Sequence, residues 1–317
     1  MDAIAGSAES ALTRFPGNGQ CWLLYAVWGA GVAKSCRVHH SLLGRVTVLE
    51  LTRSGAAHAH SHPHLLLKLA GSDGCFEVDG RPYALTDAQA ILVNSWEPHA
   101  YRHVEGARPI FLLAVYLDPR AGFASGASGG TMRFAASCMP ITHAVRSPAE
   151  VIVRELDRFS SCDARTVDES LRALLDAAPT EWDSAPAGSG RPAPAPGELH
   201  LDRRVTRCMA YMSEHLDARE DLREVGARFG LSRPHLFHLF RQSTRLTPAM
   251  YWNTLRMEFA VTRLARRDAS VGLLAQDLGF SDPGNFTRFF HAIQGVAPSD
   301  YHAAALGTSR PAPTAAL

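Results

Sequence analysis

Between about residue 41 and residue 120 the chain alternates short apolar runs with polar breaks. Short runs at this spacing are typical of strands, and the dipeptide Asp79-Gly80 between two of them favours a type I′ hairpin. The runs are residues 45–51, 65–71, 75–78, 82–85, 90–93, 99–104 and 110–117. This pattern predicts a small β-barrel or β-sandwich.

Apolar positions then change to helical spacing. Residues 149–159, which follow Pro148, and residues 167–177 each carry an apolar stripe, so two helices are predicted within a segment at 145–178. Residues 179–198 follow, with five prolines among Ala, Gly and Ser. Such a composition cannot bury a core and behaves as a linker, so the two parts of the chain are expected to fold separately.

Beyond the linker the chain repeats one pattern at an offset of about fifty residues. The matching pairs are Gly230 with Gly279, Ser232 with Ser281, Leu236 with Phe286, Phe240 with Phe290, and Pro248 with Pro298. Each copy combines a helical pattern, a glycine suited to positive φ, a serine able to cap a helix, and an apolar pair at i, i+4. This is the pattern of a helix-turn-helix, whose second helix enters the DNA major groove.

A helical pattern over residues 251–267 joins the two copies, with Leu255, Phe259, Ala260 and Leu264 on its apolar stripe. A rigid helix of this kind fixes the separation of the two modules. Two recognition helices held about 34 Å apart can enter successive major grooves on one face of a duplex.

The repeated motifs resemble those of a known family. The blocks "FGLSRPHLFHLFR", "LTPAMYWNTLRMEFAVTRL", "LGFSDPGNFTRFF" and "GVAPSDY", within residues 199–302, are similar to the DNA-binding domain of AraC/XylS-type transcription regulators. The resemblance implies a DNA-binding domain at 199–305. The sequence departs from the family pattern at Arg245, where a glycine is expected, at Gly226, where alanine is usual, and at His291, where lysine is common.

In each recognition helix some residues pack against the core, and the remaining residues are free to face DNA. The outward residues of the first copy are Arg233, Pro234, Phe237, His238 and Arg241, and those of the second include Gly284, Asn285, Thr287, Arg288 and His291. The family resemblance implies that the base readers are Pro234, Phe237, His238, Gly284, Asn285 and Arg288. Arginine pairs well with guanine and asparagine with adenine. Arg233 and Arg241 are equally consistent with phosphate contact or a solvated charge, and Phe237 is equally consistent with base contact or with partial burial against the barrel or linker.

Four histidines, His58, His60, His62 and His64, crowd into the stretch "GAAHAHSHPHLLLKLAG". This stretch resembles the first motif of cupin barrels, with His64 where a glutamate is usual, and "AILVNSWEPHAY" resembles the second, which brings His99 to the same interior. The resemblance implies an effector site at His58, His60, His64 and His99. These imidazoles could also hold a transition metal such as Zn, Ni, Cu or Fe. The alternative is a metal-free pocket or loop.

Charge and cysteine content restrict the function classes. Lys and Arg number 17 against 20 acidic residues over 1–198, but 15 against 11 over 199–317, where every cation is arginine. This basic bias permits nucleic-acid binding. The six cysteines have neither disulfide nor zinc-finger spacing, which fits a reducing cytoplasm. Residues 1–40 form an N-terminal segment of uncertain structure, whose apolar run at 21–33 is too short to cross a bilayer and a poor match to a secretion signal.

The predicted fold is α+β and multidomain: a cupin-like β-barrel followed by helices, then an all-α domain with two helix-turn-helix modules joined by a long helix, and a disordered tail at 306–317. The predicted function is sequence-specific binding of double-stranded DNA by a cytoplasmic transcription regulator under control of a small-molecule effector. Partners implied by the resemblance are a second copy of the chain, through the helices after the barrel, and RNA polymerase. The alternatives are a metal-dependent cupin enzyme fused to a helical domain, and an architectural DNA binder without an effector.

Overall fold

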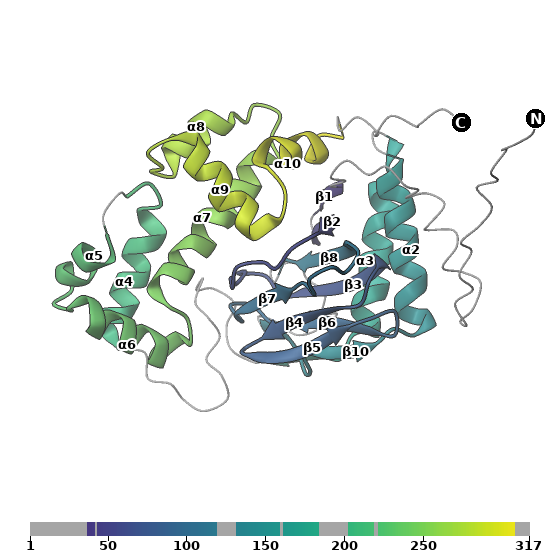
Figure 1. Cartoon of the computed structure of the whole chain (residues 1–317), viewed down its shortest axis with the longest axis horizontal. Coiled ribbons are helices and arrows are strands. Elements are labelled where there is room, and N and C mark those ends of the chain that lie inside the picture. The colour runs from purple at the N-terminus through teal and green to yellow at the C-terminus, as the bar shows by residue number, and fades with distance from the viewer. Residues whose placement is uncertain are drawn as a thin grey trace, which may run out of the picture.

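The computed structural model of the 317-residue chain describes residues 37–41, 43–118, 131–158, 161–183, 202–218 and 221–307. A part rich in strands with two helices on one side lies next to a part made only of helices (Figure 1). The predicted α+β architecture is therefore confirmed. The apolar run at 21–33 and most of the predicted linker and tail lie outside the described residues.

The larger sheet has six strands in the order β1-β2-β8-β3-β6-β10, all antiparallel to their neighbours. The strands are β1 (Arg37–Ser41), β2 (Gly44–Leu51), β3 (His64–Gly71), β6 (Gln89–Val93), β8 (Ile110–Leu117) and β10 (Cys138–Pro140). A second sheet of three strands, in the order β5-β4-β7, consists of β4 (Gly74–Val78), β5 (Arg81–Leu85) and β7 (His99–Arg102). Apolar residues from both sheets share one core, which makes the barrel interior.

The predicted hairpin and the predicted strands are confirmed. Asp79 and Gly80 join β4 to β5 with φ of 47° and 76°, as a type I′ turn requires. Each of the seven predicted runs contains a strand, although β7 ends at Arg102, two residues before its predicted end. Strands β1, β9 (Thr131–Phe134), β10 and β11 (Thr180–Asp183) were not predicted.

Two helices cover the outer face of the six-stranded sheet (Figure 1). They are α2 (His143–Asp157) and α3 (Ala164–Ala177), and both bury one apolar face against β2, β3 and β8. Helix α2 begins at His143, earlier than predicted, so Pro148 lies inside the helix and does not precede it. The predicted linker start is also wrong, since Thr180–Asp183 pair with Thr131–Phe134 as β11 and β9.

The helical part contains seven helices in the described residues. They are α4 (Arg203–Glu214), α5 (Leu222–Arg228), α6 (Arg233–Thr244), α7 (Pro248–Leu264), α8 (Val271–Asp277), α9 (Pro283–Gln294) and α10 (Pro298–Ala305). Helix α7 is the predicted joining helix, but its buried stripe differs from the predicted one: Phe259 is 37% exposed, whereas Met257 and Val261 are buried. The described residues contain no helix long and apolar enough to cross a membrane.

Apolar side chains connect the two parts of the molecule. Val38 and Leu49 of the larger sheet share a core with helices α7 to α10, and Ala59 and Trp96 share one with helices α4 to α7. The ring of Trp96 stacks on that of Tyr251 at a centroid distance of 5.0 Å. Helix α7 therefore contacts both helix-turn-helix copies and the strand-rich part.

Candidate DNA-binding surface and histidine site

The first helix-turn-helix consists of α5, a tight turn and α6. Gly230 takes φ of 69° in the turn, and the Ser232 hydroxyl accepts a hydrogen bond from the backbone N–H of His235 at 3.4 Å. Leu236 and Phe240 are fully buried and hold α6 against its neighbours. The glycine turn, the serine cap and both anchors are therefore confirmed for this copy.

The second copy consists of α8, a longer turn and α9. Gly279 takes φ of 72°, and the anchors Phe286 and Phe290 are fully buried. The cap differs from the predicted one: the carboxylate of Asp282, not Ser281, accepts the N–H of Asn285 at 3.0 Å. The extra residue in this turn moves the start of α9 one position along the chain, so Ser281 lies before the cap.

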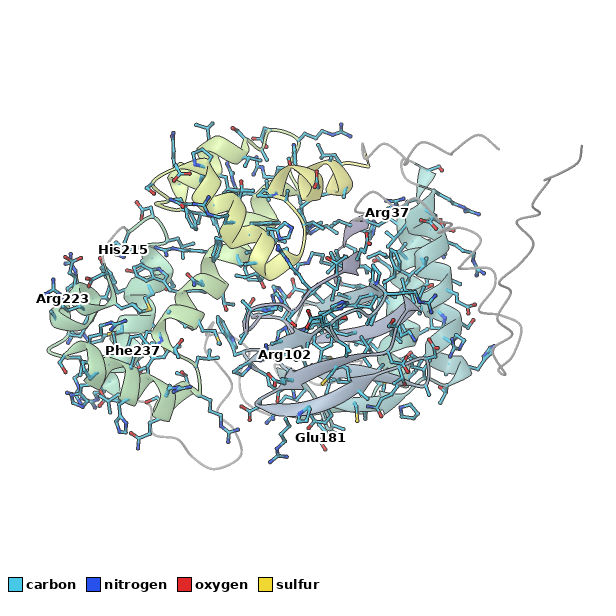
Figure 2. All side chains as sticks on the ribbon, viewed as in Figure 1. Arg37, Arg102, Glu181, His215, Arg223 and Phe237 are labelled. Carbon is cyan, nitrogen blue, oxygen red and sulfur yellow. The ribbon has the colours of Figure 1, made fainter. Side chains whose placement is uncertain are left out.

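The outer face of α6 is exposed at most of the predicted positions. Arg233, Pro234, His238 and Arg241 are exposed, and Phe237 is half-buried with the Arg233 guanidinium 5.2 Å from its ring centroid. In Figure 2 Phe237 lies among the helices, away from the sheets. Because this contact is made within α6, burial of Phe237 against the barrel or linker stays a prediction.

The outer face of α9 carries a small polar cluster. The Arg288 guanidinium donates to the Asn285 side-chain oxygen, and Gly284 is exposed beside them. The Thr287 hydroxyl donates to the Pro283 carbonyl at 2.9 Å, so its proton is already engaged within the helix. His291 is placed differently from the prediction: its Nδ1 lies 2.8 Å from Arg53 Nη2 of the strand-rich part. In this arrangement His291 faces the barrel rather than the surface shared with Arg288.

The four predicted site histidines come together at one end of the barrel. The backbones of His58 and His99 form an isolated antiparallel bridge, and His64 begins β3. His60, His64 and His99 are buried, and His58 is half-buried. One ring nitrogen from each of His58, His60 and His99 lies within 4.8 Å of the other two. His64 joins them, with its ring centroid 4.6 Å from that of His99.

All four rings use Nδ1 to contact an acceptor outside the cluster. His58 Nδ1 lies 2.8 Å from the Ala56 carbonyl, His64 Nδ1 3.2 Å from the His62 carbonyl, and His99 Nδ1 3.0 Å from the Glu97 carbonyl. His60 Nδ1 lies 3.2 Å from a carboxylate oxygen of Glu258. Because a carbonyl or carboxylate only accepts, each Nδ1 carries the proton and each Nε2 keeps a free lone pair.

Burial keeps these imidazoles neutral. Desolvation lowers the pKa of His58, and it lowers the pKa of His60, His64 and His99 well below the usual value for histidine. Neutral rings with free Nε2 lone pairs are metal ligands and hydrogen-bond acceptors. The site is therefore suited to a cation or to a ligand that donates hydrogen bonds.

A row of side chains across three strands borders the histidines. Arg45 on β2 is the cross-strand partner of Tyr116 on β8, which in turn is the partner of His64 on β3. The Arg45 guanidinium lies 4.0 Å from the centroid of the Tyr116 ring, and the His64 ring stacks on Tyr116 at 5.1 Å. Strand order thus places the Tyr116 ring between the buried arginine and the histidines.

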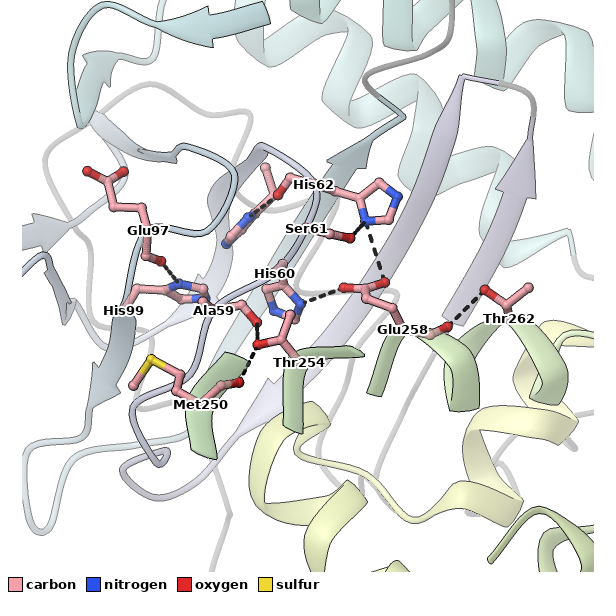
Figure 3. A network of polar contacts seen from close by, with 11 residues as sticks. Ala59, His60, Ser61, His62, Glu97, His99, Met250, Thr254, Glu258 and Thr262 are labelled. Carbon is pink, nitrogen blue, oxygen red and sulfur yellow. Dashed lines mark hydrogen bonds and ion pairs between the residues drawn. The ribbon is translucent and has the colours of Figure 1, made fainter. Parts of the chain in front are cut away.

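Helix α7 closes this end of the barrel (Figure 3). Glu258 contacts His60 Nδ1 at 3.2 Å and His62 Nδ1 at 3.4 Å, and the Thr254 hydroxyl donates to the Ala59 carbonyl at 3.0 Å. Burial alone would raise the pKa of Glu258, but the hydrogen bonds from His60 and His62 hold it well below the usual value for a carboxylic acid. Sequence reasoning missed Glu258, although it is the one acidic residue of α7.

A cavity of about 260 Å³ lies elsewhere, where β1, α2 and α10 meet. Arg37, His39, Cys162 and Arg267 are among its lining residues. None of the predicted site residues lines it.

Comparisons with known proteins cover both parts of the chain. Residues 51–202 match the family described as "AraC-like ligand binding domain", and residues 225–304 match "Helix-turn-helix domain". The MmsAB operon regulatory protein of Pseudomonas aeruginosa is 36% identical over 105 residues, which is 33% of this chain and 33% of that protein. The HTH-type transcriptional activator RhaS of Escherichia fergusonii is 23% identical over 253 residues, 78% of this chain and 87% of that protein. The crystal structure of ToxT from Vibrio cholerae O395 has a TM-score of 0.44 and 11% identity, over 83% of this chain and 98% of that one.

The fold and the two sites define a two-domain protein in which a histidine-lined barrel precedes twin helix-turn-helix modules. The chain belongs to the AraC-type regulators, with an AraC-like ligand-binding domain and a helix-turn-helix domain of that family. The family resemblance of the sequence motifs is thereby confirmed. The match to the Pseudomonas protein spans only a third of that protein's length.

Proposed function

We propose that this chain is a sequence-specific DNA-binding transcription regulator whose DNA affinity is controlled by a small-molecule effector bound at the barrel histidines. The observation that carries the proposal is the pair of recognition helices α6 and α9. Both have buried anchors and exposed polar outer faces, and both pack against the single helix α7. A protein that reads DNA through two successive major grooves needs this arrangement.

The effector part of the proposal rests on the contact between α7 and the histidine site. A ligand that changes the His58–His62 loop also changes the contacts of Thr254 and Glu258, and so acts on the helix that spaces the two recognition helices. Coupling between two sites requires such a shared element. We further propose a homodimer through α2 and α3, and contact with RNA polymerase where the DNA site adjoins a promoter. The exposed residues of these helices are mostly charged, so the dimer interface would be polar.

The competing interpretation, a metal-dependent cupin enzyme, has less support. A catalytic cupin has no use for two recognition helices, and both of these helices have buried anchors in this chain. The relatives described above are named as regulators.

Binding of the full chain and of a fragment covering residues 199–317 to the same DNA tests this proposal. Both are expected to bind, with an affinity that falls steeply as salt rises, because arginine contacts release counterions from phosphates. The full chain selects its site from a random library, and the fragment is then measured on that site. A full chain that selects no sequence, or a fragment that fails to bind even at low salt, would contradict it.

A further inference from the structure

The outer face of α9 carries a row of three hydrogen-bonded polar side chains, Asp282, Asn285 and Arg288. Asp282 caps the helix, Asn285 lies three residues further along, and the exposed Arg288 lies three residues beyond that. Side chains at this spacing are neighbours on a helix surface. The Asn285 amide donates to the Asp282 carboxylate, and its oxygen accepts from Arg288 Nη2. The predicted guanine reader is therefore tied to the cap of its own helix.

This polar row uses both N–H groups of the Asn285 amide. One donates to the Asp282 carboxylate and the other to the Ser281 hydroxyl at 2.7 Å. The partners fix the orientation of the amide, because a carboxylate only accepts hydrogen bonds and a guanidinium only donates them. An asparagine that reads adenine must donate to N7 and accept from the N6 amino group. Asn285 has no free N–H for N7 while it holds this arrangement.

Gly284 leaves the space that the polar row needs. A Cβ at this position would lie 2.9 Å from Asp282 Oδ1 and 3.8 Å from Arg288 Nη1. The first distance is shorter than a Cβ normally tolerates, so a side chain here would push the Asp282 carboxylate out of its place. Gly284 therefore contributes to the row through its missing side chain.

The first recognition helix lacks a row of this kind in the described part of the chain. Ser232, His235 and His238 occupy the matching positions of α6, and the Ser232 hydroxyl caps that helix. The cap of α6 is thus a hydroxyl and not a carboxylate, and no hydrogen bond joins His235 to His238 among the described residues. The polar row is therefore a feature of the second copy and not of the pattern that both copies share.

We propose that Asn285 positions Arg288 for one base and does not itself read DNA, with Asp282 and Gly284 setting the orientation of Asn285. The proposal rests on the DNA-binding function proposed above, and it names the residues that set specificity in the second module. Arg288 has five N–H groups, and Nη2 gives one of them to Asn285. The other N–H of Nη2 and those of Nη1 stay available for O6 and N7 of a guanine.

Positioning affects specificity because an unrestrained arginine loses rotamer freedom when it binds a base. Ordering one long side chain at an interface weakens binding about 2–12-fold. A guanidinium that Asn285 already holds avoids most of this loss, and the loss applies only to the DNA site whose base orders Arg288. Removal of the Asn285 amide should therefore reduce the preference for guanine about 2–12-fold, and removal of the Arg288 guanidinium about 5–150-fold.

The test measures the affinity of the full chain for its selected DNA site and for single-base variants of that site. Asn285→Ala should relax the preference at the base pair that Arg288→Ala relaxes, and at no other. In the Arg288→Ala background the same substitution should have no further effect, because no guanidinium is left to position.

An exchange of side chains separates positioning from base reading. The double variant Asp282→Asn/Asn285→Asp keeps the net charge, a side chain that can cap the helix, and an acceptor for Arg288. It should therefore keep the wild-type preference at the Arg288 base pair. A carboxylate cannot donate to adenine N7, so direct reading by Asn285 would be lost in this variant.

A second readout needs no DNA. In the full chain with isotope-labelled arginine, nuclear magnetic resonance relaxation should show a more mobile Arg288 Nε–H in Asn285→Ala than in the wild type or the exchange variant. The control His235→Ala changes the matching position of α6 and should alter neither the mobility of Arg288 nor the preference at its base pair. Circular dichroism checks that each variant is folded.

Several results would overturn the proposal. Relaxed preference at a second base pair in Asn285→Ala, or losses that add in the Arg288→Ala background, would show that Asn285 reads a base. Unchanged preference or unchanged Arg288 mobility in Asn285→Ala, or lost preference in a folded exchange variant, would remove the positioning role. A wild type that selects no DNA sequence would count against the proposed function, and the mobility of Arg288 would still decide whether Asn285 positions it.

Discussion

The two turn glycines provide a matched pair of substitutions. Gly230 and Gly279 have nearly the same φ, 69° and 72°, but different surroundings. A Cβ on Gly230 would meet nothing within 4 Å, whereas a Cβ on Gly279 would lie 2.2 Å from the Asp217 carbonyl oxygen. Replacing each by alanine therefore separates the cost of the backbone conformation from the cost of a steric clash.

The structure sets the expected magnitudes. Gly230→Ala should lower the free energy of unfolding by about 1–2 kcal/mol, the cost of a left-handed conformation for a residue with a Cβ. Gly279→Ala should cost a further 1–3 kcal/mol, roughly the cost of overpacking. The Asp217 backbone cannot retreat freely, because the Arg256 guanidinium donates to the carbonyls of its neighbours Leu216 and Ala218 at 2.9 and 2.8 Å.

Urea unfolding of the full chain measures the two losses, and amide hydrogen exchange locates them. Faster exchange is expected in α8 and α9 for Gly279→Ala and in α5 and α6 for Gly230→Ala. The loss should be clearly larger for Gly279→Ala. Equal losses in the two variants would refute the close approach of Asp217 to the second turn.

Two further predictions concern DNA reading and pH. Arg288→Ala should weaken binding to the selected DNA site by about 1–3 kcal/mol and relax the preference at one base pair, whereas Arg241→Ala should weaken binding to all sequences alike. Affinities for a panel of single-base variants of the site distinguish the two effects. A uniform loss of affinity for Arg288→Ala would show that Arg288 contacts the DNA backbone and not a base. Burial lowers the pKa of His64, which is 1% exposed, well below its usual 6.5, so the folded chain excludes a proton that the unfolded chain binds as the pH falls below that value. Unfolding free energy should therefore fall between about pH 7 and pH 5, and fall less in His64→Gln, whose amide does not titrate and can still donate to the His62 carbonyl; identical pH profiles would contradict this.

Local patterns in the sequence were enough to predict most elements. The seven strands and the two helix-turn-helix copies were found because each carries its own periodicity and turn residues, such as Asp79-Gly80 and Gly279. Strands β1, β9, β10 and β11, of three to five residues each, were missed. Their pairing depends on partners far along the chain, for example Thr180 with Phe134, and no local pattern encodes it.

The site was predicted in part for the same reason. The alternation of side chains along a strand and the resemblance to cupin motifs predicted that His58, His60, His64 and His99 lie together. The structure places them in one cluster. The role of Glu258 could not be predicted, because it lies 198 residues from its partner His60 in the sequence. The helical pattern around Glu258 does not indicate a contact with the barrel. His291 was misplaced because its orientation depends on Arg53 of the other domain.

Hydroxyl-radical footprinting of the full chain on its selected DNA site tests the central claim most directly. The account predicts two protected patches on one face of the duplex, centred about one helical turn or 10 base pairs apart, because α7 holds α6 and α9 for successive major grooves. Substitutions in α6 should remove one patch and substitutions in α9 the other. A single patch that both sets of substitutions weaken alike, or uniform protection without a preferred sequence, would contradict a regulator that reads DNA with two recognition helices.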